Sequence, residues 1–357
     1  MNIEELKQKM KILPKHPRIW KPYKIHWNWD ISFKCNYKCS YCEVVRRDEE
    51  FNTQIADTDK WREVWDRIFD NYWCTHIRFS GGEPTIYPNF LPFLGMLLKK
   101  HTVDITTNLS FDLNKFLDKV KPGGLSISAS FHPEFTDFET FFEKLKYLHF
   151  NGFPSTLSYV GYPPHLDKIP EYKKRLEDLH MYFKIIPFIG NYKGKKYPEA
   201  YNARERRLLE GFATDSKDEH LNDINSRWVK WRVEKEKNQE TRNSKIKLGK
   251  LCRMGQMYAK IHPDLTVTRC CAGYHGKQSG SLGFLLDKNF KLLDEPQACT
   301  VDYDCPCFKG MFVGEDENKW EPLWESLDHS IYKIEYMKEY AKYLKEQGKN
   351  NYGKYTK

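Results

Sequence analysis

The sequence predicts an α/β protein with a parallel sheet covered by helices, followed by a smaller cysteine-rich α+β region. Between residues 24 and 189, segments in which apolar residues alternate with polar ones are interleaved with segments whose apolar residues recur at helical spacing. This repeated change is typical of β–α units, which build parallel sheets with helices outside. Further along, six of the ten cysteines fall between residues 252 and 307.

The first expected strand covers residues 24–33. Its apolar residues, Ile25, Trp27, Trp29, Ile31 and Phe33, are separated one by one by polar residues. A period of two indicates a strand with one apolar face and one polar face.

Five helices and five more strands follow in alternation. The expected helices cover residues 59–73, 90–100, 113–120, 138–148 and 166–179, and the strands cover 76–80, 103–107, 125–129, 156–160 and 182–189. Roughly six parallel strands result, and in β–α units the loops after the strands form the binding face.

The alternation stops near residue 190. We expect a basic loop over 191–201, a short helix over 204–212, a hairpin over 257–268 and a helix over 320–347. The expected organisation is an N-terminal extension (1–23), a core (24–200), a charged connector (201–250), a cysteine-rich domain (251–319) and a C-terminal helix with a basic tail (320–357).

Composition favours a cytoplasmic protein. No apolar stretch is long enough to cross a membrane, and residues 1–10 are charged and lack the apolar segment of a secretory signal. In a reducing compartment, clustered cysteines indicate metal binding or catalysis more often than disulfides. The net charge of +9 is read as a solvated lysine-rich surface, with attraction to an anionic partner as the alternative.

A C-x3-C-x2-C cluster, Cys35, Cys39 and Cys42, follows the first strand directly. Thiolates are soft ligands that suit iron–sulfur clusters. Three thiolates leave one iron of a four-iron cubane without a protein ligand, so that iron can bind a substrate or cofactor. The alternative is a zinc site, which usually needs four ligands; no fourth Cys or His lies close in sequence.

A second motif, Gly81-Gly82-Glu83-Pro84, follows the second expected strand. Glycines let the backbone approach a ligand closely, and a carboxylate at this point can meet an ammonium group. Taken alone, the motif is better explained as a tight turn into a helix.

The two motifs, in this order, resemble those of the radical S-adenosylmethionine superfamily, whose cysteine loop has this spacing and an aromatic residue, here Tyr41, before the last cysteine. The resemblance implies a partial (β/α)6 TIM-like barrel. It also implies a [4Fe–4S] cluster on Cys35, Cys39 and Cys42 that chelates S-adenosyl-L-methionine, with the Gly81–Pro84 motif contacting the methionine amino group.

Polar residues near the ends of the third and fourth strands are candidates for further cofactor contacts. The resemblance implies ribose-binding side chains on the fourth strand, where we expect Ser128 first and Ser130 next, and Asn108 ends the third strand. Ordinary strand termination explains each of them nearly as well. His132 is a candidate substrate or proton-transfer residue, and a surface histidine is the alternative.

The later cysteines resemble the auxiliary-cluster extensions called twitch and SPASM domains. Cys252 and Cys270 flank the expected hairpin, and Cys305 and Cys307 return later. These four are the expected ligands of one auxiliary [4Fe–4S] cluster, with Cys299 in reserve and zinc as the alternative. A full SPASM pattern would need more cysteines.

The resemblance implies an oxidoreductase-type enzyme. A reduced cluster would cleave S-adenosylmethionine to a 5′-deoxyadenosyl radical, which abstracts hydrogen from a substrate. The short segment before the first strand favours a small, possibly anionic, metabolite over a peptide, with a flavodoxin- or ferredoxin-type protein as reductant. The alternatives are a peptide or protein maturase and a non-catalytic, metal-stabilised nucleic-acid-binding protein; nucleic acid is disfavoured because no RNA-binding module is visible.

Overall fold

The protein is described from a computed structural model covering residues 25–42, 58–72, 75–179, 181–214, 248–270, 280–301 and 312–313. The expected helix over 320–347 and most of the charged connector lie outside these residues, as do Cys305 and Cys307. Within this part of the chain, no helix is long and apolar enough to cross a membrane.

A nine-stranded sheet forms the centre of the fold, in the order β12-β11-β10-β1-β2-β3-β4-β5-β6. Strands β1 to β6 are all parallel and follow each other in chain order. The six strands are β1 (His26–Ser32), β2 (His76–Gly81), β3 (Thr102–Thr107), β4 (Leu125–Phe131), β5 (Ser155–Gly161) and β6 (Tyr182–Pro187). The predicted partial (β/α)6 barrel is therefore confirmed.

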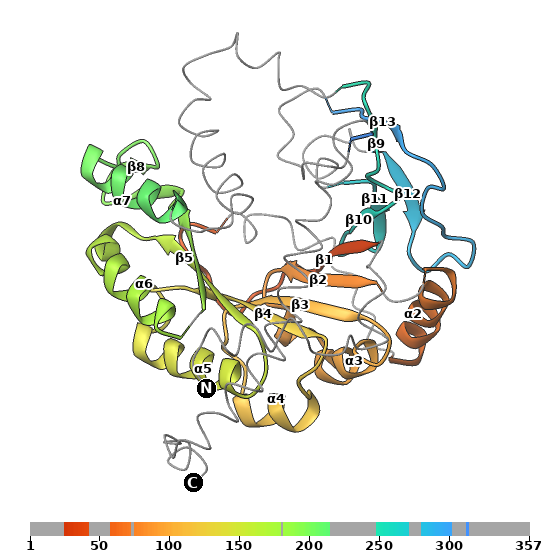
Figure 1. Cartoon of the computed structure of the whole chain (residues 1–357), viewed down its shortest axis with the longest axis horizontal. Helices are drawn as coiled ribbons and strands as arrows, with labels where there is room; N and C mark the ends of the chain where they lie inside the picture. Colours follow the sequence, from red (N-terminus) through yellow and green to blue (C-terminus); the bar gives the residue numbers. More distant parts are fainter. Residues whose placement is uncertain are drawn as a thin grey trace, which may run out of the picture.

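Five α-helices cover the outer face of the curved sheet (Figure 1). They are α2 (Thr58–Tyr72), α3 (Phe90–Leu97), α4 (Leu113–Lys119), α5 (Phe138–Phe150) and α6 (Ile169–Glu177). Aspartates begin two of them: the Asp112 carboxylate accepts from Lys115 N at the start of α4, and Asp137 accepts from Thr140 N at the start of α5.

The core lies between the sheet and these helices. Trp27 and Trp29 of β1 point outward, where Trp29 lies 5.0 Å from Trp61 and Trp27 lies 6.0 Å from Trp65 of α2, ring centre to ring centre. All four rings are almost fully buried. Each ring stabilises the fold by roughly 2–3 kcal/mol through burial. The polar residues between them consequently face the inside of the barrel.

Two local predictions need correction. The expected helix over 166–179 begins instead as a 3₁₀ segment, η3 (Pro163–Lys168), and α6 starts at Ile169. Pro170 suits the first turn of α6 because it has no N–H to leave unpaired. The expected loop over 191–201 contains a hairpin, β7 (Gly190–Tyr192) with β8 (Lys195–Tyr197), followed by α7 (Ala203–Thr214). Its turn residues, Lys193 and Gly194, both have positive φ, as two-residue hairpin turns require.

The cysteine-rich segment extends the barrel sheet. The predicted hairpin is present as β10 (Tyr258–Ile261) and β11 (Thr266–Thr268), and β12 (Ser281–Phe284) pairs with β11. Strand β10 also lies parallel to β1, which the sequence did not predict. Short strands β9 (Leu251–Cys252) and β13 (Gln297–Ala298) form a separate antiparallel pair.

Candidate active site

The cysteine loop starts at the carboxyl end of β1, where the turn after β2 holds it. Gly82 N donates to Ser32 O at 2.8 Å, and Glu83 N donates to Lys34 O at 2.9 Å. A Cβ on Gly81 would lie 2.2 Å from Ser32 O, and one on Gly82 would lie 2.0 Å from Lys34 O. Only glycine fits this close approach, so the two sequence motifs meet as one unit.

The three thiols of this loop share one electrostatic environment. Burial, together with the charges of Cys42, Glu134 and Cys35, raises the pKa of the Cys39 thiol to about 12. Burial likewise raises the pKa of Cys35, to which Glu83 and Cys42 contribute. Clustered thiols of this kind become thiolates when a positively charged centre binds them. The donor set therefore fits an iron–sulfur cluster.

No three His, Cys, Asp or Glu side chains of the described residues come together closely enough to hold a single metal ion.

Glu83 links the loop to the end of β3. Its Oε1 accepts from Thr85 N, Thr85 Oγ1 and Thr107 Oγ1, whereas Oε2 accepts one hydrogen bond, at 2.7 Å from Asn108 N. Burial raises the pKa of this carboxyl, and the four hydrogen bonds oppose that shift. A carboxylate has about four acceptor positions, two on each oxygen, so Oε2 is the oxygen with room for another donor.

Asn108 continues this link towards the cysteines. Its Nδ2 donates to Asn36 Oδ1 at 3.0 Å and lies 4.0 Å from Cys35 Sγ. The amide side chain at the end of β3 thus lies beside the first cysteine of the loop.

His132 contacts the loop from the end of β4. Its Nδ1 lies 3.0 Å from Tyr41 Oη and 3.5 Å from Cys39 Sγ, and its ring stacks on that of Tyr41. Burial lowers the pKa of His132 to about 4, so the imidazole is neutral near pH 7. Glu134 accepts from both the N–H and the hydroxyl of Ser40. The segment after β4 therefore holds the far side of the cysteine loop.

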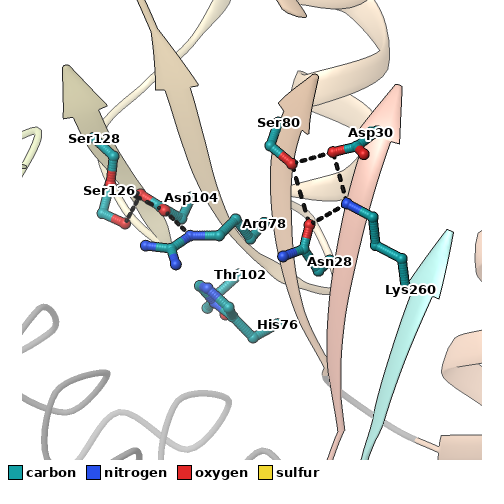
Figure 2. Close-up of polar contacts among 10 residues, drawn as sticks. All are labelled: Asn28, Asp30, His76, Arg78, Ser80, Thr102, Asp104, Ser126, Ser128 and Lys260. Carbon is teal, nitrogen blue, oxygen red and sulfur yellow. Dashed lines mark hydrogen bonds and ion pairs between the residues drawn. The ribbon is translucent and has the colours of Figure 1, made fainter. Parts of the chain in front are cut away.

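The inner face of the barrel carries a polar network (Figure 2). Asp104 of β3 accepts from Arg78 Nε at 2.7 Å and from the hydroxyls of Ser126 and Ser128 at 3.0 Å. The Ser128 hydroxyl is thus already engaged with a carboxylate. Ser130 lies one alternate position further along β4, closer to the cysteine loop.

A second network on the inner face joins β10 to β1 (Figure 2). Lys260 Nζ lies 2.7 Å from Asp30 Oδ1 and donates to Asn28 Oδ1 at 3.0 Å, while the Ser80 hydroxyl donates to Asp30 at 2.6 Å. These inner charges were not predicted from the sequence. The sequence did contain a signal for them, because the inward-facing positions of the alternating strands are occupied by ionisable residues.

Three cysteines of the later segment are buried together. Cys252, Cys270 and Cys299 belong to one small core cluster. Burial, together with the charges of Cys299 and Cys270, raises the pKa of Cys252 to about 11. Cys299, predicted as a reserve, thus lies with the two predicted cysteines that the structure describes.

Arg269 holds this second cysteine group together. Its guanidinium donates to the carbonyls of Met254, Gln297 and Ala298, the last two belonging to the strand directly before Cys299. Arg269 was not predicted as a functional residue, although its position next to Cys270 was a usable signal.

Comparison with known proteins defines the class of domain. Residues 29–176 match the family described as the Radical SAM superfamily. The chain therefore contains a radical S-adenosylmethionine domain, whose enzymes use a [4Fe–4S] cluster with S-adenosylmethionine. At the level of this domain, the predicted family and its cofactor pair are confirmed.

Individual relatives are more distant. A 101-residue stretch is 27% identical to the antilisterial bacteriocin subtilosin biosynthesis protein AlbA of Bacillus subtilis (strain 168), covering 28% of this chain and 22% of that protein. Streptococcus suis SuiB bound to its precursor peptide SuiA is 17% identical, with a TM-score of 0.50 over 81% of this chain and 67% of that one. Native anSMEcpe with bound AdoMet is 14% identical, with a TM-score of 0.50 over 90% of this chain and 100% of that one. This chain spans about a fifth of the length of AlbA.

These relatives correct the prediction of a small-molecule substrate. AlbA is named for the biosynthesis of a bacteriocin, and SuiB has been solved with its precursor peptide. Both names point to peptides. The prediction rested on the length of chain before the first strand, and that length says nothing about how a peptide could lie across the barrel.

Proposed function

We propose that this protein is a radical S-adenosylmethionine enzyme that modifies a peptide. One observation carries the proposal: the two sequence motifs are in direct contact. The turn containing Gly81 and Gly82 packs against the base of the Cys35–Cys42 loop. When bound, the cluster and S-adenosylmethionine supply a 5′-deoxyadenosyl radical that abstracts a hydrogen atom from the substrate.

Cys35, Cys39 and Cys42 would hold the [4Fe–4S] cluster as thiolates. The burial that raises the pKa of Cys39 also keeps water away from its sulfur, whereas Cys35 is only partly buried. Tyr41 and His132 cover one side of this loop, and their mutual contact fixes the orientation of both rings.

Three further residues would hold S-adenosylmethionine. Glu83 Oε2 has room to accept a hydrogen bond from the methionine ammonium group. Asn108 lies beside the first cysteine and can donate through its amide. On β4 we favour Ser130 for the ribose hydroxyls, because Ser128 donates to Asp104.

Cys252, Cys270 and Cys299 would hold the auxiliary cluster, together with a fourth ligand for which Cys305 and Cys307 are the candidates. An auxiliary cluster can accept an electron from a substrate radical. We therefore propose an oxidation or a crosslink within the peptide as the outcome.

Iron and product analysis tests the two cluster sites. Anaerobically reconstituted protein should contain about eight irons per chain, four for each cubane. Reduction in the presence of S-adenosylmethionine should release 5′-deoxyadenosine. The triple Cys35→Ala, Cys39→Ala, Cys42→Ala variant should form none, whereas Cys252→Ala should lose about half of its iron and still form it. Zinc in place of iron, or 5′-deoxyadenosine from the triple variant, would refute the assignment.

Mass spectrometry tests the substrate class. Short peptides encoded beside the gene would be incubated with the enzyme, S-adenosylmethionine and reductant. We expect a peptide that has lost a pair of hydrogen atoms, in step with 5′-deoxyadenosine formation. Formation of 5′-deoxyadenosine that no such peptide stimulates would argue against a peptide substrate.

A further inference from the structure

Two cationic side chains face the interior of the barrel from opposite parts of the sheet. Arg78 lies in the middle of β2, between Ile77 and Phe79, which are fully buried on the outer face. Lys184 lies on β6, next to Phe183, which packs against Tyr159 of the core. Because side chains alternate along a strand, Arg78 and Lys184 both point inward.

Solvent reaches this part of the inner face. The side chain of Arg78 is 44% exposed, although it sits at the centre of a strand with neighbours on both sides. The Asp104 side chain that it pairs with is only 6% exposed. The guanidinium therefore borders open space inside the barrel, while its carboxylate partner is covered.

Most of the donors on these two cations are unused. Arg78 donates to Asp104 through Nε alone, and Figure 2 shows its two Nη atoms turned away from that carboxylate. Within the described residues, neither Nη nor Lys184 Nζ has a hydrogen-bond partner. The two inner carboxylates are already occupied, since Asp30 pairs with Lys260 and Asp104 pairs with Arg78.

The positive charge of Lys184 therefore has no carboxylate partner among the described residues. Burial, together with the positive charge of Arg78, lowers its pKa to about 8. Both side chains point into the same interior, from β2 and from β6. A desolvated cation next to a second cation is stabilised by an anion placed between them.

We propose that the two Nη groups of Arg78 and Nζ of Lys184 bind a carboxylate of the substrate. This proposal rests on the proposed function and names a chemical feature of its substrate. A carboxylate matches the parallel donors of a guanidinium, and the lysine supplies a second charge. Such a contact would pin an acidic group deep in the barrel, leaving the adjoining part of the peptide at the mouth, near Cys35, Cys39 and Cys42.

Protection of Lys184 from an amine-reactive reagent tests the proposal. Reconstituted full-length protein would be acetylated near pH 8 with and without a probe, and labelling of each lysine would be read by peptide mapping. The probes are Ac-Gly-Glu-Gly-NH2, which has a side-chain carboxylate, Ac-Gly-Gly-Gly-OH, which has only a terminal one, and neutral Ac-Gly-Gln-Gly-NH2. Lys119, exposed on α4, is the internal control.

We expect a carboxylate probe to slow labelling of Lys184 by about fivefold, which is the effect at pH 8 of raising its pKa from about 8 by one unit. The neutral probe should have no effect, and Lys119 should be labelled equally throughout. Whichever carboxylate probe protects better identifies the source as a side chain or a chain end. Arg78→Gln should abolish the protection while the circular dichroism spectrum stays that of the wild type, and Arg78→Lys should restore part of it.

Equal effects of neutral and acidic probes would overturn the proposal, as would no effect of either. Protection by S-adenosylmethionine and not by the peptides would overturn it too, because the cations would then serve the cofactor. The labelling needs no turnover, so its outcome does not depend on whether the protein is catalytically active. If the protein releases 5′-deoxyadenosine but Lys184 is not protected, the carboxylate site alone is refuted. If Lys184 is protected but no 5′-deoxyadenosine is released, the proposed function alone is refuted.

Discussion

Gly82 determines how closely the two sequence motifs can approach. A Cβ at this position would lie 2.0 Å from Lys34 O, a contact that the backbone cannot relieve without moving the cysteine loop. We expect Gly82→Ala to destabilise the fold by about 2–3 kcal/mol, as overpacking does, and to lower the bound iron. Denaturant unfolding and iron analysis would measure both effects.

Gly95 provides a matched control for that prediction. It lies within helix α3, and a Cβ there would meet nothing closer than Lys119 O at 3.6 Å. Gly95→Ala should stabilise the protein by about 0.5–1 kcal/mol through helix propensity and leave the iron content unchanged. If Gly95→Ala and Gly82→Ala lost iron equally, close approach would not explain the Gly-Gly pair.

His101 links the stability of the core to pH. Its Nδ1 accepts from Thr75 N, and its Nε2 lies 3.3 Å from Trp65 O, so the neutral imidazole is the form that fits. Burial lowers its pKa to about 4 from an ordinary value near 6.5. Between these pH values the unfolded chain binds the extra proton, so acidification from 6.5 to 4 favours unfolding.

We therefore expect His101 to lower the free energy of unfolding by up to about 1.4 kcal/mol for each unit by which the pH falls between 6.5 and 4. His101→Asn should lower stability by about 1–3 kcal/mol at pH 7 and reduce the slope below pH 6.5. Urea unfolding at several pH values gives both quantities. An unchanged slope in the variant would show that other groups carry the pH dependence.

At the scale of elements, Arg269 connects three segments of the cysteine-rich region. Its guanidinium donates to the carbonyls of Met254, Gln297 and Ala298, and the residue is buried. Arg269→Lys cannot satisfy three divergent acceptors, so we expect Cys252 and Cys299 to separate. Alkylation of both thiols by iodoacetamide in iron-free protein should become at least several times faster than in the wild type.

Arg204→Lys serves as the control, since Arg204 is exposed on α7. It should leave alkylation of both cysteines unchanged. Equal rates in wild type and Arg269→Lys would mean that β9 and β13 hold the cysteines without the guanidinium.

Elements with strict periodicity were predictable from sequence. The alternation from Ile25 to Phe33 predicted β1 because one face of that strand meets α2 and the other faces the barrel interior. The β7–β8 hairpin was missed because its charged residues give no apolar pattern and only Lys193-Gly194 marks the turn.

For the whole molecule, long-range pairing was the unpredictable part. The position of the cysteines after β1 and of the Gly81–Pro84 turn after β2 follows from local sequence. The parallel pairing of β10 with β1 joins residues more than two hundred positions apart, and no local pattern encodes it. The same holds for Arg78 and Lys184, which face one interior because the sheet curves around it.

The pairing of β10 with β1 predicts that the barrel and the cysteine-rich strands unfold together. Lys260 of β10 forms a buried ion pair with Asp30 of β1 at 2.7 Å, with both side chains less than 9% exposed. Lys260→Met should cost about 3–5 kcal/mol because it leaves the Asp30 carboxylate buried and unpaired. The double variant Lys260→Met, Asp30→Asn should regain much of that loss, since the amide carries no charge. Tryptophan fluorescence and far-UV circular dichroism should then report one shared unfolding transition in every variant. Two separate transitions in the wild type would show instead that β10 and its neighbours fold independently of the barrel.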